Sequence, residues 1–263
     1  MISLKRINAV IIQEWHISRR SLEVIMDLPF FSLINVALFG FMSIYMLGST
    51  QSVTAHYLLL GAVFWEIIRI TQYSMTVSSL WNVWSRNLSN MFITPLSTVE
   101  YLLANMLAGV LKSVVLVSGL ALLTIPLFNF NIFMLGWPTL ILSAINLILF
   151  AWAIGLILLG LIFRFGIRVQ ALGWAVIYIF QPLCAVYFPV SIFPKVLQYI
   201  AYLFPPTYVF EALRYNLQFN QAQLSGQIWA LGLNGIYFLS AIGLFYYLFN
   251  KSRTTGQFAR NES

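Results

Sequence analysis

The stretch NVWSRNLSNMFITPLSTVE, residues Asn82–Glu100, interrupts a long apolar part of the chain with polar side chains. It carries the charged residue Arg86 and the turn sequence TPLS at Thr94–Ser97, and an apolar run of membrane-spanning length lies on each side of it. Polar side chains and irregular backbone are unsatisfied in hydrocarbon. We therefore expect residues 82–98 to project from a membrane as a short amphipathic segment, and we interpret it as a docking element for a cytoplasmic partner.

The composition sets the class of protein. Of the 263 residues, 60% are hydrophobic and only 8% are charged, and the mean hydropathy is +0.86. A soluble domain carries about 25% charged residues, so this chain cannot cover itself with polar surface. We predict an all-α integral membrane protein with a single transmembrane domain over residues 1–263.

Cysteine content and charge exclude several alternatives. The single cysteine, Cys184, excludes an internal disulfide and a CxxC metal site. Residues Met1–Arg20 are charged and amphipathic, without the short apolar core of a cleavable signal peptide. A net charge of +7 would suggest nucleic acid in a soluble protein, but here the distribution of basic residues indicates membrane orientation instead. We expect no metal site and no nucleic-acid partner.

The first segment, residues 1–22, has the pattern of an amphipathic helix. Leu4, Ile7, Ile11 and Trp15 recur at helical spacing, and the basic and amide side chains lie mostly elsewhere around the helix. Such a helix suits the headgroup plane of a membrane, with its basic groups toward anionic lipid. The alternative is a helix packed on the protein's own cytoplasmic side.

Six apolar segments follow, each near or above the roughly 20 residues that cross a bilayer as a helix. They are Leu28–Leu47, His56–Leu80, Tyr101–Phe128, Ile132–Phe163, about Val169 to Val190, and Ile228–Phe249. With the N-terminus in the cytoplasm, ten of the fourteen Lys and Arg residues lie on the inner side: Lys5, Arg6, Arg19, Arg20, Arg86, Arg164, Arg168, Lys251, Arg253 and Arg260. Only Lys195 and Arg214 lie outside, so basic residues favour six spans with both termini cytoplasmic.

The outer connection, residues 188–227, is too apolar for an ordinary surface loop. Ser191–Phe204 is apolar but too short to cross, Pro205 and Pro206 break it, and Thr207–Leu217 resumes a helical pattern with Glu211 and Arg214 three residues apart. We predict a re-entrant helical hairpin that dips into the outer leaflet before the last span. The alternative is a pair of helices lying flat on the outer interface.

This layout resembles the ABC-2 family of ABC-exporter permeases. The sequence at Thr94–Ser97, followed by Glu100 and Tyr101, is similar to the family's P-[LIV]-S-x-x-E pattern at the start of the third span. The sequence Phe204–Tyr208, followed by Glu211–Arg214, is similar to the family's hydrophobic-P-x-[TS]-[YH]…E-x-x-R pattern ahead of the last span. The layout covers nearly the whole chain, and each motif is short.

The resemblance implies a transport subunit that depends on a separate ATPase. No Walker-type GxxxxGK[ST] loop occurs in the chain, and no segment is large enough to be a soluble ATPase domain. ATP and magnesium would therefore bind to the partner, and this chain would hold no cofactor and catalyse no reaction. The resemblance further implies a second permease copy, in a homodimer or a heterodimer, with spans one, two and five at the interface.

By the same resemblance, Asn82–Thr94 would be the coupling helix that docks on the ATPase. Its expected contacts are Arg86, Asn87, Asn90, Met91 and Phe92. The alternative is an ordinary amphipathic loop helix on the lipid headgroups.

Three charged residues interrupt the second and third spans. Glu66 and Lys112 each lie about 15 Å from the nearer end of their antiparallel spans at 1.5 Å per residue, so both fall near the midplane. Arg69 is one helical turn from Glu66. A lone charge there costs about 3 kcal/mol or more, so we expect Glu66 to pair with Lys112 or Arg69. The cluster either holds the spans together or leaves a positive charge facing a pathway for an anionic headgroup or acidic sugar.

We therefore predict the permease subunit of an ABC exporter in a bacterial inner membrane, in contact with membrane lipid. The substrate stays open among drug, lipid, glycolipid and polysaccharide; the aromatic residues, 16% of the chain, could stack on sugars or form interfacial belts. One alternative is a channel or scaffold. Another is an intramembrane enzyme, but His16 and His56 lie at predicted membrane edges, and Glu66 is the only deep acid.

Overall fold

The computed structural model describes residues 2–47, 52–85 and 87–255, and for residues 52–55, 88, 89 and 92 it describes the backbone alone. Every regular element within these ranges is a helix, which confirms the predicted all-α class. The first half contains α1 (Leu4–Arg20), α2 (Leu22–Ile25), a π-turn (Met26–Phe30), α3 (Phe31–Leu47), α4 (Ser52–Trp84), α5 (Leu88–Ile93) and α6 (Thr98–Phe128).

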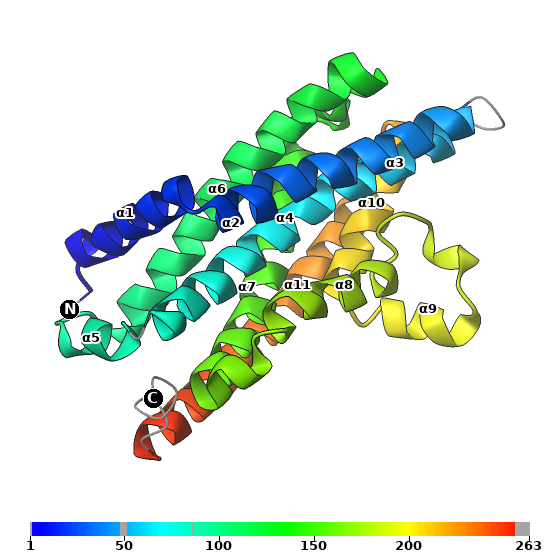
Figure 1. Cartoon of the computed structure of the whole chain (residues 1–263). Coiled ribbons are helices and arrows are strands. Elements are labelled where there is room, and N and C mark those ends of the chain that lie inside the picture. Colours follow the sequence, from blue (N-terminus) through cyan, green and yellow to red (C-terminus); the bar gives the residue numbers. More distant parts are fainter. Residues whose placement is uncertain (1, 48–51, 86, 256–263) are drawn as a thin grey trace.

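The second half of the chain continues the bundle. It contains a 3₁₀ turn (Ile132–Leu135), α7 (Trp137–Phe165), a second 3₁₀ turn (Gly166–Val169), α8 (Leu172–Leu183), a third 3₁₀ turn (Val190–Ile192), α9 (Lys195–Ala201), α10 (Pro205–Phe219) and α11 (Leu224–Thr254). The start of α1, the short helix α5 and the end of α11 gather at one end of the elongated bundle, and α9 projects from it away from that end (Figure 1).

Helix α4 forms the centre of the bundle, and α3, α6 and α7 pack along it (Figure 1). It has 33 residues and is therefore about 50 Å long at 1.5 Å per residue. Leu59, Trp65 and Ile68 on this helix are fully enclosed. Because neighbouring helices surround α4, its polar side chains meet protein groups that can satisfy them, which lipid could not do.

Four helical stretches are long and apolar enough to cross a membrane: Leu22–Leu47, Thr98–Phe128, Trp137–Val169 and Leu224–Thr254. They correspond to the first, third, fourth and sixth predicted segments. Helix α4 has sufficient length, but charged and amide side chains interrupt its apolar sequence. Helix α8, with 12 residues, measures about 18 Å against a hydrocarbon core of roughly 30 Å. The chain is a multi-pass membrane protein, and the count of six spans stays a prediction.

Buried amide side chains join α7 to α11. The Asn146 amide donates to the Gln227 side-chain oxygen at 3.2 Å, and the Asn234 amide donates to Asn146 Oδ1 at 3.0 Å. The Gln227 amide donates in turn to the Ser143 hydroxyl at 2.7 Å. Hydrogen bonds of this kind hold helices together where both surfaces are apolar and water is absent.

The start of α6 follows the predicted turn. The Ser97 hydroxyl accepts from the Glu100 backbone N–H, and the Glu100 carboxylate accepts from the Ser97 backbone N–H, which together form a capping box. This reciprocal cap satisfies two of the N–H groups that a helix start leaves without partners. It therefore fixes where the polar segment ends and the long apolar helix begins.

Helix α1 lies lengthwise on α6. The Ser3 backbone N–H donates to Glu100 Oε1 at 2.7 Å, and the Lys112 ammonium donates to Glu14 Oε2 at 3.1 Å, so the two helices run side by side in the same direction. Ile7, Val10 and Glu14 form the buried face of α1. Of the two arrangements expected for residues 1–22, these contacts match the helix packed on the protein's own surface.

Residues 188–227 contain two helices separated by the proline pair. Helix α9 is short and mostly exposed, whereas α10 is buried against α7 and α11. Pro205 and Pro206 are buried at the first positions of α10, where the missing N–H groups have no intrahelical partner to lose. The proline break is where the sequence predicted it, and the re-entrant path across the outer leaflet stays a prediction.

Candidate functional site

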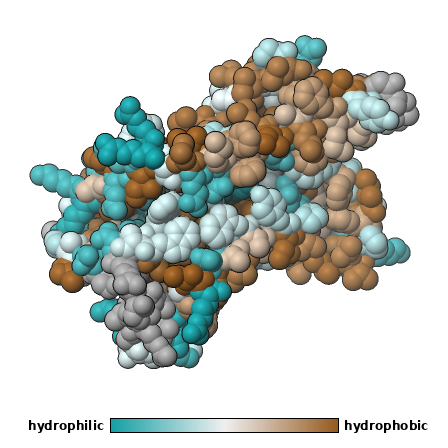
Figure 2. Space-filling model, in the orientation of Figure 1, coloured by the Kyte–Doolittle hydropathy of each residue, from teal (hydrophilic) through white to brown (hydrophobic). Residues whose placement is uncertain are grey.

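Polar residues follow one face of α4, in the space between α3 and α8. Figure 2 shows a band of polar surface across the middle of the molecule, with hydrophobic surface on its borders. Two cavities of about 170 and 210 Å³ lie here, and Phe31 of α3, Arg69 of α4 and Tyr178 of α8 line both of them. We call these two cavities together the α4 groove.

A charged pair forms the wall of the α4 groove. Arg69 Nε and Nη2 each lie 2.7 Å from Glu66 Oε2. Glu66 is fully buried and Arg69 is 8% exposed. The Ser32 hydroxyl donates to Glu66 Oε2 at 2.6 Å, and the Asn35 amide donates to Glu66 Oε1 at 2.9 Å. Both carboxylate oxygens are therefore bonded, as a buried charge requires.

The π-turn before α3 supplies acceptors for the arginine. Pro29 has no N–H, and the Phe31 N–H bonds to the carbonyls of Leu28 and Met26, which leaves out the Asp27 carbonyl. That carbonyl accepts from Arg69 Nη1 at 2.8 Å, and the Leu28 carbonyl accepts from Nη2 at 3.1 Å. Local π-turns are frequent at functional sites because they expose backbone groups in this way.

Further polar contacts continue down the groove toward α5. The Tyr73 hydroxyl donates to Asp27 Oδ2 at 2.6 Å, and Gln72 Nε2 donates to the Gly173 carbonyl of α8 at 3.1 Å. Near its lower end the Trp84 indole donates to Gln170 Oε1 at 3.2 Å. The face of α4 between α3 and α8 is therefore hydrogen-bonded to both neighbours along much of its length.

The predicted three-residue charge cluster is corrected by the structure. Glu66 pairs with Arg69, which was one of the two expected partners, but Lys112 belongs to a different pair. Its ammonium lies 3.1 Å from Glu14 Oε2, on the far side of α4 from the groove and in contact with α1. Depth in the membrane places Glu66 and Lys112 at similar levels, but it does not specify which way around the helix each side chain points.

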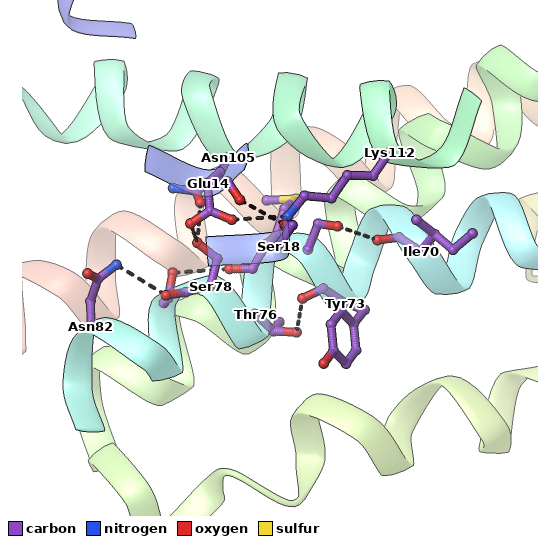
Figure 3. A network of polar contacts seen from close by, with 12 residues as sticks. Glu14, Ser18, Ile70, Tyr73, Thr76, Ser78, Asn82, Asn105 and Lys112 are labelled. Atoms are coloured by element: carbon purple, nitrogen blue, oxygen red, sulfur yellow. Dashed lines mark hydrogen bonds and ion pairs between the residues drawn. The ribbon is translucent and has the colours of Figure 1, made fainter. Parts of the chain in front are cut away.

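Glu14 is the centre of a second polar network, drawn in Figure 3. The Ser78 hydroxyl of α4 lies within hydrogen-bonding distance of both Glu14 Oε1 and Asn105 Oδ1. The Asn105 amide donates to the Tyr101 carbonyl at 2.8 Å. Residues from α1, α4 and α6 thus meet at one buried carboxylate.

Sequence reasoning missed Glu14, although a signal for it exists. Ile7 and Val10 form the buried stripe of α1, and Glu14 occupies the next position on that stripe. A carboxylate on the apolar face of a helix predicts a buried cationic partner elsewhere in the chain. Lys112 has no obvious partner in its own span, so it was the candidate for the cation that pairs with Glu14.

The predicted coupling segment has a shorter helix than expected. Asn82 and Trp84 still belong to α4, and α5 covers only Leu88–Ile93. Asn87 is the N-cap residue of α5 and Asn90 is exposed.

Two of the five predicted contacts lie outside the described structure: Arg86 entirely, and the side chain of Phe92. Met91 is 8% exposed and packs in the protein's own core, so it offers little surface to a partner. Among the described side chains of α5, Ile93 is apolar and 82% exposed.

A clamp joins this segment to α1. Arg6 Nη1 donates to the Pro95 carbonyl and to Glu100 Oε2, the latter at 3.2 Å. Glu100 also accepts from the Ser3 backbone N–H. The start of α1, the turn after α5 and the start of α6 are therefore held together at the same end of the bundle.

At the opposite end of the bundle, Glu211 and Arg214, which lie three residues apart, form an ion pair on α10. Arg214 Nη2 donates to Glu211 Oε1 at 2.8 Å, and Nη1 donates to the Val186 carbonyl at 3.2 Å. Glu211 Oε1 also accepts from the Val190 backbone N–H at 2.8 Å. The pair therefore fastens the chain after α8 to α10.

These observations define a class of protein. Long apolar helices make the chain a multi-pass membrane protein, and the α4 groove places a buried charged pair and amide side chains at a cavity between those helices. Intramembrane charges facing a cavity are typical of proteins that move a substrate through a membrane.

Comparison with known proteins identifies the family. The family model described as ABC-2 type transporter matches residues 7–218, and the chain belongs to this family. It is therefore a membrane component of an ABC transporter, and membership in the family implies an ABC-type ATPase as a partner. No curated protein matches the chain.

Proposed function

We propose that the chain is the permease subunit of an ATP-driven exporter and works as a dimer of permease subunits with a separate ABC ATPase subunit. The α4 groove is the observation that carries this proposal. It places a charged pair and amide side chains along a cavity between two helices, α3 and α8. One chain supplies such a surface from one side, and a second copy facing it would enclose a pathway.

The rims of the groove support a dimer. On α3, Phe31, Ile34 and Leu38 are exposed, and on α8, Tyr178 and Ile179 are exposed. Apolar rims around a polar floor suit contact with a second permease subunit, because the rims would be buried while the floor stays open to substrate. The same three elements, α3, α4 and α8, correspond to the spans that the family resemblance puts at the interface.

The proposed topology has six spans in a bacterial inner membrane, with both termini in the cytoplasm. Helices α4 and α8 would be the second and fifth spans, sheltered from lipid by the other helices and the second copy. The gathering of α5 with the start of α1 and the end of α11 supports a common cytoplasmic face (Figure 1). Helices α9 and α10 would form the re-entrant element on the outer face.

ATP-driven movement would enter through α5. Asn90 and Ile93 point outward from this helix, while Met91 anchors it in the core. Since Arg6 and Glu100 fasten the turn after α5 to both α1 and α6, displacement of α5 by the ATPase would move the three elements together. Helix α4, which leads into α5, would transmit the displacement to the groove.

The substrate class we propose is an amphipathic, lipid-linked or polysaccharide molecule. The groove offers polar contacts on its floor and apolar contacts on its rims, so it suits a molecule that has both kinds of surface. Export as the direction rests on the family resemblance.

Disulfide crosslinking tests the arrangement. In a Cys184→Ala background, Leu38→Cys and Ile179→Cys would be introduced together into the chain. Oxidation should then produce a covalent dimer in membranes. The matched control is Ile236→Cys, an exposed apolar position on α11 outside the groove, which should stay monomeric. Crosslinking through Ile236 but not through the groove rims would contradict the proposed interface.

Co-purification separates the exporter from the alternatives. An exporter subunit should bring down a Walker-containing ATPase, and reconstitution of the pair should give substrate-stimulated ATP hydrolysis. If the purified chain alone moved solutes across vesicles, it would be a channel and the proposal would be wrong.

A further inference from the structure

A second polar cavity lies at the end of the bundle opposite α5, and the proposed function does not use it. Its volume is about 480 Å³, larger than either cavity of the α4 groove, and it lies between the start of α4, helix α10 and the start of α11. Ligand pockets in proteins typically have volumes of about 300–1,000 Å³. We call it the α10 pocket.

Aromatic side chains dominate the walls of the α10 pocket. They are Tyr57, Tyr202, Tyr208, Tyr215 and Trp229. The rings of Tyr202 and Tyr208 lie with their centroids 5.4 Å apart at 53°, too close together to leave a ligand-sized space between them. The rings therefore offer separate faces rather than a closed aromatic cage, and each tyrosine also carries a hydroxyl at its edge.

The charges at the pocket neutralise each other. Arg214 is 3% exposed, and its guanidinium is engaged by Glu211 Oε1 and the Val186 carbonyl. All the hydrogen bonds of the Glu211 carboxylate within the described part of the chain go to Oε1, which leaves Oε2 as an acceptor. An anion could reach Arg214 only by displacing Glu211, and the attraction of a cation to Glu211 would be offset by Arg214, whereas a neutral donor of hydroxyl hydrogen bonds would bond to Oε2 without disturbing the pair.

Amide and hydroxyl groups complete the lining. Gln218, Gln223 and Ser225 border the pocket, and the Tyr57 hydroxyl donates to Gln218 Oε1 at 3.2 Å. Each of these groups can both donate and accept hydrogen bonds. The pocket therefore combines flat apolar ring faces with neutral donors and acceptors at their edges.

We propose that the α10 pocket binds a sugar ring or a similar neutral, hydroxyl-rich group. A pyranose has one face of C–H groups, which would stack on Trp229 or a tyrosine ring, and a rim of hydroxyls, which would reach Glu211 Oε2 and the amides. The group could be a free sugar or the head of a glycolipid. Binding at this pocket depends on neither the ATPase partner nor the direction of transport.

The test measures sugar binding to the full-length chain in phosphatidylglycerol nanodiscs, prepared without sugar detergents that would occupy the pocket. Saturation-transfer NMR with methyl glucoside, N-acetylglucosamine and myo-inositol should show saturable binding to at least one of them. A dissociation constant on the order of 2 mM is expected for about twelve non-hydrogen atoms. Choline and inorganic phosphate should show no saturable binding. Addition of a glycolipid to the nanodiscs should displace the sugar only if lipid heads reach the pocket.

Three variants tie the binding to this pocket. Trp229→Ala, at a side chain that is 69% exposed, should weaken sugar binding about three- to tenfold through loss of one stacked ring. The matched control Trp137→Ala, at an exposed tryptophan outside the pocket, should leave binding unchanged. Glu211→Gln should weaken the sugar further and create phosphate binding, because Arg214 would lose its counter-ion.

Four results would overturn the proposal: no saturable binding by any of the three sugars, binding of choline in their place, equal effects of the two tryptophan variants, or unaltered phosphate affinity in Glu211→Gln.

Discussion

Replacing Glu66 with glutamine should lower the free energy of unfolding by about 3 kcal/mol, the lower end of the range for removing one partner of a buried ion pair. The lower end applies because Arg69 keeps other acceptors, namely the carbonyls of Asp27 and Leu28 and the Ser32 hydroxyl. A change of about 3 kcal/mol is roughly a 140-fold change in the unfolding equilibrium.

Double-mutant cycles would show which cation pairs with Glu66. Unfolding of the full-length protein in mixed micelles would be followed by detergent titration for Glu66→Gln, Arg69→Gln, Lys112→Gln and their pairs. Glu66→Gln and Arg69→Gln should be strongly non-additive, because they remove the two sides of one contact. Glu66→Gln and Lys112→Gln should add to within about 0.5 kcal/mol, as expected for residues without a shared partner.

The second pair gives the matched comparison. Glu14→Gln and Lys112→Gln should be as non-additive as the groove pair, because their charges lie 3.1 Å apart. Coupling of Glu66 to Lys112 with no coupling to Arg69 would refute the division into two networks. A cost below about 1 kcal/mol for Glu66→Gln would show that the pair is not a buried one in the folded protein.

Further predictions concern the π-turn, a close helix contact and the coupling helix. Pro29→Ala supplies a backbone N–H and favours α geometry, in which the Asp27 carbonyl bonds within the helix and no longer accepts from Arg69. The free energy of unfolding should fall by about 1.5 kcal/mol in the same titration. Unchanged stability would argue against this role of the π-turn. Gly61→Ala should destabilise the fold by about 1–3 kcal/mol or more, because the new Cβ would overlap the Val186 carbonyl oxygen. Gly232→Ala, with open space around it, should be neutral or stabilising. Ile93→Asp should reduce retention of the ATPase about tenfold in pull-downs without altering the helix content of the permease; full retention would remove α5 from the docking surface.

Several local features were predictable because adjacent residues determine them. The Ser97–Glu100 capping box, the proline break at Pro205 and the i,i+3 pair of Glu211 and Arg214 each depend on a few neighbouring residues. The sequence also identified the class, because a chain with 60% hydrophobic and 8% charged residues cannot cover itself with polar surface. Such features need no knowledge of how the helices are arranged.

The partner of Lys112 was not predictable from depth alone. Position along a span gives a level in the membrane, but the direction of a side chain depends on which helices pack around it. The second case is Asn82, which we interpreted as the start of an exposed polar segment. It is buried in the last turn of α4 and donates to the Ser78 carbonyl at 3.1 Å. Sequence polarity does not distinguish a solvated residue from one in a buried hydrogen-bond network.

The buried carboxylate of α1 also constrains the order of events during synthesis. Glu14 leaves the ribosome 98 residues ahead of Lys112, which at 5–20 residues per second is a wait of about 5–20 s. An unpaired carboxylate is not stable in hydrocarbon for that time. The newly synthesised first helix must therefore stay at the membrane–water interface until the third apolar segment has been inserted. The folded arrangement is therefore reached by a late docking step, and the amphipathic pattern of the N-terminus suits the waiting stage as well as the finished protein.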